Sequence, residues 1–199
     1  MKAILLLTAF CLSVASSHCA EPEKFSAQFT KANSFDVARY YVAVTRKILV
    51  ITPEAITCGI NINLHTNGTM AEVLSAIETA TTNQTPVRWD KSDPHRISLT
   101  GPIRESSPPA NGDGLVSFQG ADVSQVLRVY GAMGNATLII TPEALMIGGS
   151  IKLEATGSRE EIKEKIAEAI ANQSDVRLTQ LDKDHIAVTL KGQKIPEKD

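Results

Sequence analysis

The sequence has little cysteine, few aromatic residues and no surplus of positive charge. Only Cys11, Cys19 and Cys58 occur in 199 residues, which is not a disulfide framework, so stability must come from packed apolar cores. A formal net charge of −2 argues against nucleic acid or an anionic membrane as a partner. Beyond the first 20 residues no apolar run reaches about 18 residues, so we expect no membrane span in the mature chain.

The N-terminus has the pattern of a secretory signal peptide. Lys2 supplies a basic start, residues 3–15 are apolar, and small residues follow. We therefore expect residues 1–20 to be removed during export, which predicts a secreted protein. Lipidation at Cys19 is disfavoured, because His18 stands where such a signal requires a small residue.

The main feature that is present is an internal repeat. The residues Ile-Thr-Pro-Glu-Ala occur at 51–55 and again at 140–144. Pairing each residue n with n+89 from Ala27 to Thr100 needs no gap, and about a third of the pairs are identical. The repeat predicts two domains, residues 25–101 and 115–192. Residues 102–114 are rich in Pro, Gly and Ser and are predicted to be a linker, and residues 193–199 a polar tail.

Each copy is predicted to fold as β-α-β-β-α-β-β, an α+β unit. Apolar residues at helical spacing follow the helix caps Asn33 and Asp122. The short apolar stretches 48–52 and 137–141 predict a central strand that ends at a proline. Thr-x-x-Glu at 69–72 and Ser-x-x-Glu at 158–161 are capping boxes that start a second helix. We expect two superposable domains, each a small sheet with two helices packed on one face and its own core.

Residues that could carry chemistry do not form a recognisable site. His65, His95 and His185 lack metal-ligand spacing, and Cys58 lies between apolar residues without a catalytic signature. Gly131-Ala-Met-Gly is better explained by the end of a helix than by an RNA-binding loop. We therefore predict no catalytic, cofactor-binding or metal-binding residues, and no enzyme.

Four repeated arginines are the candidate partner-binding residues. Arg39 and Arg128 recur in the first helices, together with Glu54 and Glu143 at the end of a strand. These could form a functional surface or a structural pair within each copy, and the sequence favours neither.

The other two arginines, Arg88 and Arg177, recur in the final hairpins, which are the expected edges of the sheets. An edge strand can accept a partner strand through its unpaired backbone groups. The hypothesis is that a partner, or the twin domain, docks at an edge near Arg88 or Arg177.

The second copy resembles the short N-terminal domain of bacterial secretins and TonB-dependent transducers. The resemblance is carried by residues 118–128 (Phe-Gln-Gly-Ala-Asp-Val-Ser-Gln-Val-Leu-Arg), an apolar strand, Pro-Glu-Ala-Leu at 142–145, the alternating residues 151–153, a capped helix and a last hairpin. The first copy is similar, so the resemblance covers residues of about 25–101 and 115–191.

The resemblance implies a periplasmic, non-enzymatic module that docks other proteins. Because the two copies stand without the pore or barrel segment of those proteins, we do not expect the chain to be a secretin or receptor itself. The predicted function is an adaptor or accessory of an envelope secretion, pilus or uptake assembly. Its predicted partners are envelope proteins, with self-association as a further interaction. The alternatives are a periplasmic ligand-binding or inhibitory protein and an enzyme of unrecognised type.

Overall fold

A computed structural model describes residues 24–58, 61–102, 114–134 and 136–196. The predicted signal peptide, residues 103–113 of the predicted linker and the last three residues of the predicted tail lie outside this part of the chain. The described chain mixes helices and strands, which confirms the predicted α+β class.

Both repeats have the same order of elements. The first repeat contains β1 (Phe25–Ala32), α1 (Ser34–Thr45), β2 (Ile48–Ile51), α2 (Pro53–Cys58), β3 (Ile62–Gly68), α3 (Met70–Gln84), β4 (Arg88–Asp90) and β5 (Arg96–Thr100). The second contains β6 (Gly114–Ala121), α4 (Val123–Met133), β7 (Thr137–Ile140), α5 (Pro142–Met146), β8 (Ile151–Gly157), α6 (Arg159–Gln173), β9 (Val176–Asp182) and β10 (His185–Leu190).

The short helices α2 and α5 were not expected. Pro53 and Pro142 were predicted only to end strands, whereas each is the first residue of a helix. Proline suits this position, because its fixed φ is already helical and its missing amide hydrogen would have no helical partner there. The repeated Pro-Glu-Ala sequence is therefore a helix start.

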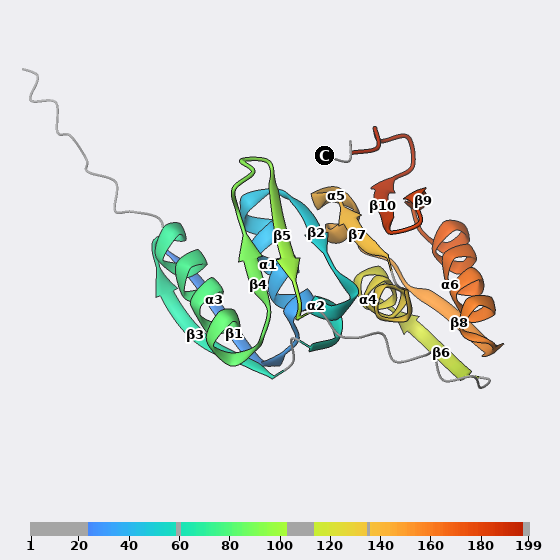
Figure 1. The fold of residues 1–199 in the computed structure, drawn as a ribbon, viewed down its shortest axis with the longest axis horizontal. Coiled ribbons are helices and arrows are strands. Elements are labelled where there is room, and N and C mark those ends of the chain that lie inside the picture. The colour runs from blue at the N-terminus through green and yellow to red at the C-terminus, as the bar shows by residue number, and fades with distance from the viewer. Residues whose placement is uncertain (1–23, 59–60, 103–113, 135, 197–199) are drawn as a thin grey trace, which may run out of the picture.

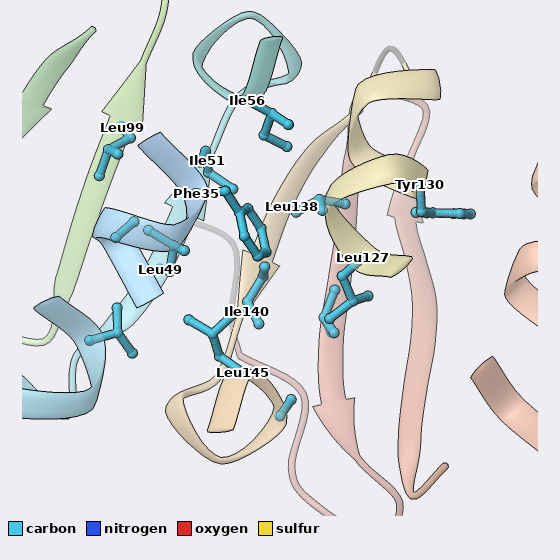
Figure 2. Close-up of a cluster of buried hydrophobic side chains, with 14 of the residues drawn as sticks. Phe35, Leu49, Ile51, Ile56, Leu99, Leu127, Tyr130, Leu138, Ile140 and Leu145 are labelled. Carbon is cyan, nitrogen blue, oxygen red and sulfur yellow. The ribbon is translucent and has the colours of Figure 1, made fainter. Parts of the chain in front are cut away.

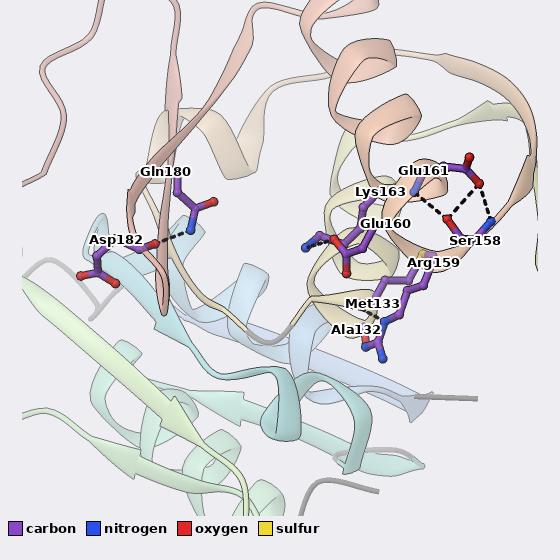
Figure 3. A network of polar contacts seen from close by, with 9 residues as sticks. All are labelled: Ala132, Met133, Ser158, Arg159, Glu160, Glu161, Lys163, Gln180 and Asp182. Carbon is purple, nitrogen blue, oxygen red and sulfur yellow. Dashed lines mark hydrogen bonds and ion pairs between the residues drawn. The ribbon is translucent and has the colours of Figure 1, made fainter. Parts of the chain in front are cut away.

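The predicted caps of the longer helices are confirmed. The Asn33 side chain accepts the amide of Asp36, and Asp122 accepts the amide of Ser124. The capping boxes at Thr69 and Ser158 are also formed, with the second shown in Figure 3.

A glycine precedes each capping box. A Cβ at Gly157 would lie 2.5 Å from Oε2 of Glu161, and its φ is +138°, so a side chain there would collide with the capping carboxylate. Gly68 has the same relation to Glu72, at 2.6 Å.

The strands of each repeat form two sheets rather than one. In the first repeat β1 and β3 pair antiparallel as a two-stranded ribbon, and β6 and β8 do the same in the second. The remaining strands form one six-stranded sheet with the order β4-β5-β2-β7-β10-β9. Because α3 contacts both its ribbon and β4, and α6 contacts both its ribbon and β9, helices lie between the two kinds of sheet. The expected arrangement, helices on one face of one small sheet, is wrong in this respect.

The two repeats are joined through their central strands. β2 and β7 pair antiparallel, with Leu49 opposite Ile140, Val50 opposite Ile139 and Ile51 opposite Leu138. Under the repeat, Val50 and Ile139 are the same position, so this register maps onto itself when the repeats are exchanged. The molecule is thus a pseudo-twofold pair of repeats, which lie side by side with β1, β3 and α3 at one end and β6, β8 and α6 at the other (Figure 1).

One core extends across this junction, and the prediction of two separate cores is wrong. Buried side chains of both repeats form a single cluster, seen in Figure 2 from Leu99 through Ile51, Phe35 and Ile140 to Leu127. The physical reason is that a strand without a neighbour on one side leaves backbone groups unpaired and apolar side chains exposed. The central strand of each repeat supplies the neighbour that the other lacks.

Short helices of one repeat pack against long helices of the other. α2 contacts α4, and α1 contacts α5. At the first contact a Cβ on Gly131 would lie 2.6 Å from Cδ1 of Ile56 and 2.9 Å from Cδ1 of Leu138. Tyr41 and Tyr130 are buried at matching positions of α1 and α4, as predicted.

Candidate interaction surface

Arg88 and Arg177 lie on the two outer strands of the six-stranded sheet. β4 carries Arg88 and β9 carries Arg177, and these strands stand at opposite ends of the strand order. Both arginines are exposed. The final hairpins therefore form the sheet edges, as the sequence analysis expected, and the pseudo-twofold relates one edge to the other.

Backbone groups of both edge strands point outward. The carbonyl of Leu99 accepts the amide of Thr52 (3.1 Å) and thus faces β2, so the backbone of its partner Trp89 faces away from the sheet. In the second repeat the carbonyl of Val188 accepts the amide of Thr141 (3.0 Å), which leaves the backbone of Leu178 facing outward. Trp89 and Leu178 are repeat-related positions.

The first outward amide of each edge is satisfied by the chain itself. Val87 donates to the hydroxyl of Thr85 and Val176 to that of Ser174, each at 3.2 Å. An incoming strand would therefore pair from Trp89 or Leu178 onward. β9 is the longer platform, with seven residues against three in β4.

The β4 edge rests on an aromatic and charged cluster. The rings of Trp89 and Tyr41 are 5.0 Å apart. The Tyr41 hydroxyl donates to Glu78 at 2.8 Å, and Glu78 also pairs with Lys91 at 2.6 Å. Burial raises the pKa of the Tyr41 hydroxyl, and its hydrogen bond to Glu78 raises it further. The Trp89 side chain thus packs against Tyr41 on α1, while its backbone pairs with Leu99.

Arg39 lies at the junction of the repeats and not at an edge. Its guanidinium donates to the hydroxyl of Ser124 (2.7 Å) and lies 3.5 Å from the Asp122 carboxylate, both at the start of α4. The structural pair proposed with Glu54 is therefore replaced by a contact between repeats. Arg128, the repeat-related residue, is half-buried on α4. The position that corresponds to Asp122 in the first repeat is the neutral Asn33, so Arg128 has no matching aspartate there.

A groove of about 820 Å³ opens beside the β4 edge. Its residues come from the start of α2, the end of α3 and the turn after it, the start of β4, and the end of β5. They are Thr52, Glu54, Thr82, Thr85, Pro86, Val87, Arg88, Thr100, Gly101 and Pro102. Sequence reasoning did not identify this groove, although the repeated Thr-Pro-Glu at its rim was a signal.

A smaller hollow lies between the repeats. It has a volume of about 390 Å³ and is lined by Phe29, Asp36, Arg39, Tyr40 and Ala43 of the first repeat and Met146 of the second. Phe29 and Tyr40 meet edge to face at 5.6 Å, and the Tyr40 hydroxyl donates to the carbonyl of Ser26. Its walls are therefore largely apolar, and Asp36 and Arg39 are the charged residues among them.

The other residues considered in the sequence do not come together. His65 lies on β3, His95 precedes β5 and His185 pairs with Asp182 at 3.0 Å. In the described residues no three His, Cys, Asp or Glu side chains are grouped so as to hold a metal. Gly134 ends α4, with its amide bonded to the carbonyl of Tyr130. Within the same residues, no helix is long and apolar enough to cross a membrane.

Comparison with known proteins identifies no relative. No family model matches the sequence, and neither the search of curated proteins nor the search of solved structures found a match.

Proposed function

We propose that this chain is a secreted, periplasmic protein–protein interaction module without enzymatic activity. It serves as an adaptor or accessory of an envelope secretion, pilus or uptake assembly, in keeping with its resemblance to the short N-terminal domain of secretins and TonB-dependent transducers. The observation that carries the proposal is the outward-facing backbone of Trp89 and Leu178 on β4 and β9, the two outer strands of the six-stranded sheet in the described part of the chain. A partner segment adds to one of these edges as a further strand.

The arginines give the docking strand its selectivity. Arg88 and Arg177 precede the outward-facing residues by one position and are exposed at both edges. Main-chain hydrogen bonds supply affinity for any extended segment, whereas a guanidinium on one face favours a segment with an acidic or polar side chain at the opposite position. The twin repeat is not the partner at these edges, since the repeats are joined through β2 and β7.

The test uses proline at an outward amide. Leu178→Pro removes a donor that no described strand uses, so folding should be retained. Thr179→Pro, one residue later, removes an inward donor and is the destabilising comparison. Envelope proteins that copurify with the wild-type chain are identified, and each is titrated against purified wild type, Leu178→Pro and the double charge reversal Arg88→Glu/Arg177→Glu. Circular dichroism verifies folding, and undiminished binding by both folded variants contradicts the proposal.

The hollow between the repeats favours a second candidate, a periplasmic ligand-binding or inhibitory protein. Its largely apolar lining, which also includes Asp36 and Arg39, suits a small molecule or a single apolar side chain. Met146→Glu places a charge in this hollow and leaves both sheet edges intact. Loss of binding in this variant, with Leu178→Pro unaffected, would favour the second candidate.

A further inference from the structure

The second repeat shows how its own chain occupies the counterpart of the groove beside β4. After β10, Lys191 extends its amine to the end of α6 and donates to the carbonyls of Ala171 (2.8 Å) and Ser174 (2.7 Å). These carbonyls lie at the negative end of the helix, which favours a cation. Lys191 thus caps α6 from outside the helix.

Two residues later, Gln193 is bound on three sides. Its side-chain oxygen accepts the hydroxyl of Thr141 (2.9 Å) and the amide of Leu190 (3.1 Å). Its side-chain amide donates to the Glu143 carboxylate at 2.9 Å. The repeated Thr-Pro-Glu sequence therefore acts in the second repeat as a receptor for a glutamine side chain.

In the described part of the first repeat, the receptor groups are present without these ligands. Thr82, Thr85, Thr52 and Glu54 match Ala171, Ser174, Thr141 and Glu143 under the repeat, and all four line the 820 Å³ groove. Pro102 stands at the position of Lys191 and has no amine to offer.

The receptor groups of the first repeat line an accessible groove. Glu54 is half-buried, and its carboxylate has no hydrogen bond or ion pair with another residue in the described part of the chain. The hydroxyl of Thr52 accepts the amides of Ala55 and Gly101, each at 3.3 Å, and no residue in the described ranges accepts its own proton. Hydrogen-bonding capacity that is used in the second repeat is thus not used by the described residues of the first.

We propose that the groove beside β4 binds an extended segment of a partner protein that carries a lysine followed two residues later by a glutamine. The ammonium group caps the end of α3, and the glutamine amide bridges Thr52 and Glu54, as Lys191 and Gln193 do in the second repeat. The inference rests on the proposed function and names the chemistry of the partner segment.

The chain supplies its own probe and its own reporter. A synthetic peptide of residues 188–196 (Val-Thr-Leu-Lys-Gly-Gln-Lys-Ile-Pro) contains the ligand pattern and no tryptophan. The single tryptophan of the protein, Trp89, lies on β4 next to the groove residues Val87 and Arg88. Its fluorescence reports binding at the first repeat and not at the second.

Titration of the full chain with this peptide should give a saturable change in Trp89 fluorescence with one site. Alanine in place of the first lysine or of the glutamine of the peptide should weaken binding about tenfold or more, the loss expected for a hydrogen bond to a charged group. Glu54→Gln should weaken it to a similar extent. Glu143→Gln is the matched control, because it makes the same change in the occupied groove and should leave the affinity unchanged.

Three results would overturn the inference. These are no saturable change, equal affinity for the alanine peptides, and equal weakening by Glu54→Gln and Glu143→Gln. If the protein self-associates as its concentration rises and Glu54→Gln abolishes this association, the segment bound in the groove is the tail of a second copy. The proposal of a separate partner protein is then wrong. Leu178→Pro should not affect peptide binding, so the inference and the edge-docking function can fail independently.

Discussion

Val50 and Ile139 face each other across the centre of the six-stranded sheet, and they are also the same position of the two repeats. Leu49 opposite Ile140 and Ile51 opposite Leu138 follow from this pairing, because the register is symmetric about its central pair. The chain therefore has the interface of an isologous dimer built into one polypeptide. If one repeat is expressed without the other, its central strand should form the same interface with a second molecule.

The second repeat expressed alone, as residues 115–192, should fold cooperatively and form a homodimer through β7. Without β2 the apolar strand β7 becomes a sheet edge, and a second copy can supply Leu138, Ile139 and Ile140 in the self-complementary register. The expected result is a dimer in sedimentation equilibrium and a thermal transition that rises with protein concentration.

Ile139→Lys in this fragment is the test of the interface, because each lysine would lie opposite its own copy. The variant should be monomeric and less stable. A fragment that is monomeric and fully stable, or one without any cooperative transition, would contradict the prediction.

Gly131→Ala should destabilise the protein through the junction of the repeats. The added methyl group meets Cδ1 of Ile56 at 2.6 Å and Cδ1 of Leu138 at 2.9 Å. Overpacking of this kind costs about 1–3 kcal/mol, and the better helix propensity of alanine returns up to about 1 kcal/mol.

Chemical denaturation of wild type and four variants separates overpacking from other causes. Gly148→Ala, where no atom lies within 4 Å of the new methyl group, should leave the free energy of unfolding almost unchanged. Ile56→Val removes the closest atom and should restore part of the stability lost in Gly131→Ala. If the double variant is as unstable as the sum of the single changes, steric contact with Ile56 is not the cause.

Local features of the fold were readable from the sequence, because short-range interactions determine them. The caps at Asn33 and Asp122 and the capping boxes at Thr69 and Ser158 are formed as predicted, since each satisfies amides within three residues of itself. The division of each repeat into a ribbon and a share of a larger sheet was missed. Alternation of apolar residues tells which face of a strand is buried but not which strand lies beside it.

The joining of the repeats was also beyond the sequence analysis, although β2 and β7 carried a signal. The four residues of each strand are almost wholly apolar, which predicts a central strand but not that the two strands pair with each other. In the structure each strand is central in the sheet because the other pairs with it. The candidate site divides in the same way: Arg88 and Arg177 lie at sheet edges as expected, whereas the contact of Arg39 with Asp122 depends on the packing of the two repeats.

The capping carboxylates should make stability depend on acid pH. Backbone and hydroxyl hydrogen bonds from Thr69 lower the pKa of Glu72 below 4.5, and those from Ser158 lower the pKa of Glu161 in the same way. A pKa that is depressed in the folded state adds stability above the unfolded pKa, and this stability is lost as pH falls through the folded pKa.

Glutamine variants test this dependence without removing the caps. Glu72→Gln and Glu161→Gln keep a side chain that can accept the capping amide but cannot titrate. The free energy of unfolding, measured from pH 6 down to about pH 3, should fall less steeply in the double variant than in wild type. Parallel curves would show that these two carboxylates do not contribute to the acid dependence.

The contact between Arg39 and Asp122 should contribute modestly to holding the repeats together. Both side chains are about one third exposed, and such pairs contribute about 0.2–1 kcal/mol. Asp122→Asn removes the charge while keeping a good helix cap, as Asn33 shows at the matching position of the first repeat.

A double-mutant cycle with Arg39→Met and Asp122→Asn isolates the ion pair, because methionine keeps most of the apolar stem of arginine. The coupling free energy should be below about 1 kcal/mol and should decrease in about 1 M salt, where the Debye length is near 3 Å. Ser124→Ala should add a separate loss of about 1 kcal/mol, since its hydroxyl accepts the 2.7 Å hydrogen bond from Arg39. A coupling energy of zero at both salt concentrations would assign the role of Arg39 to Ser124 and to packing alone.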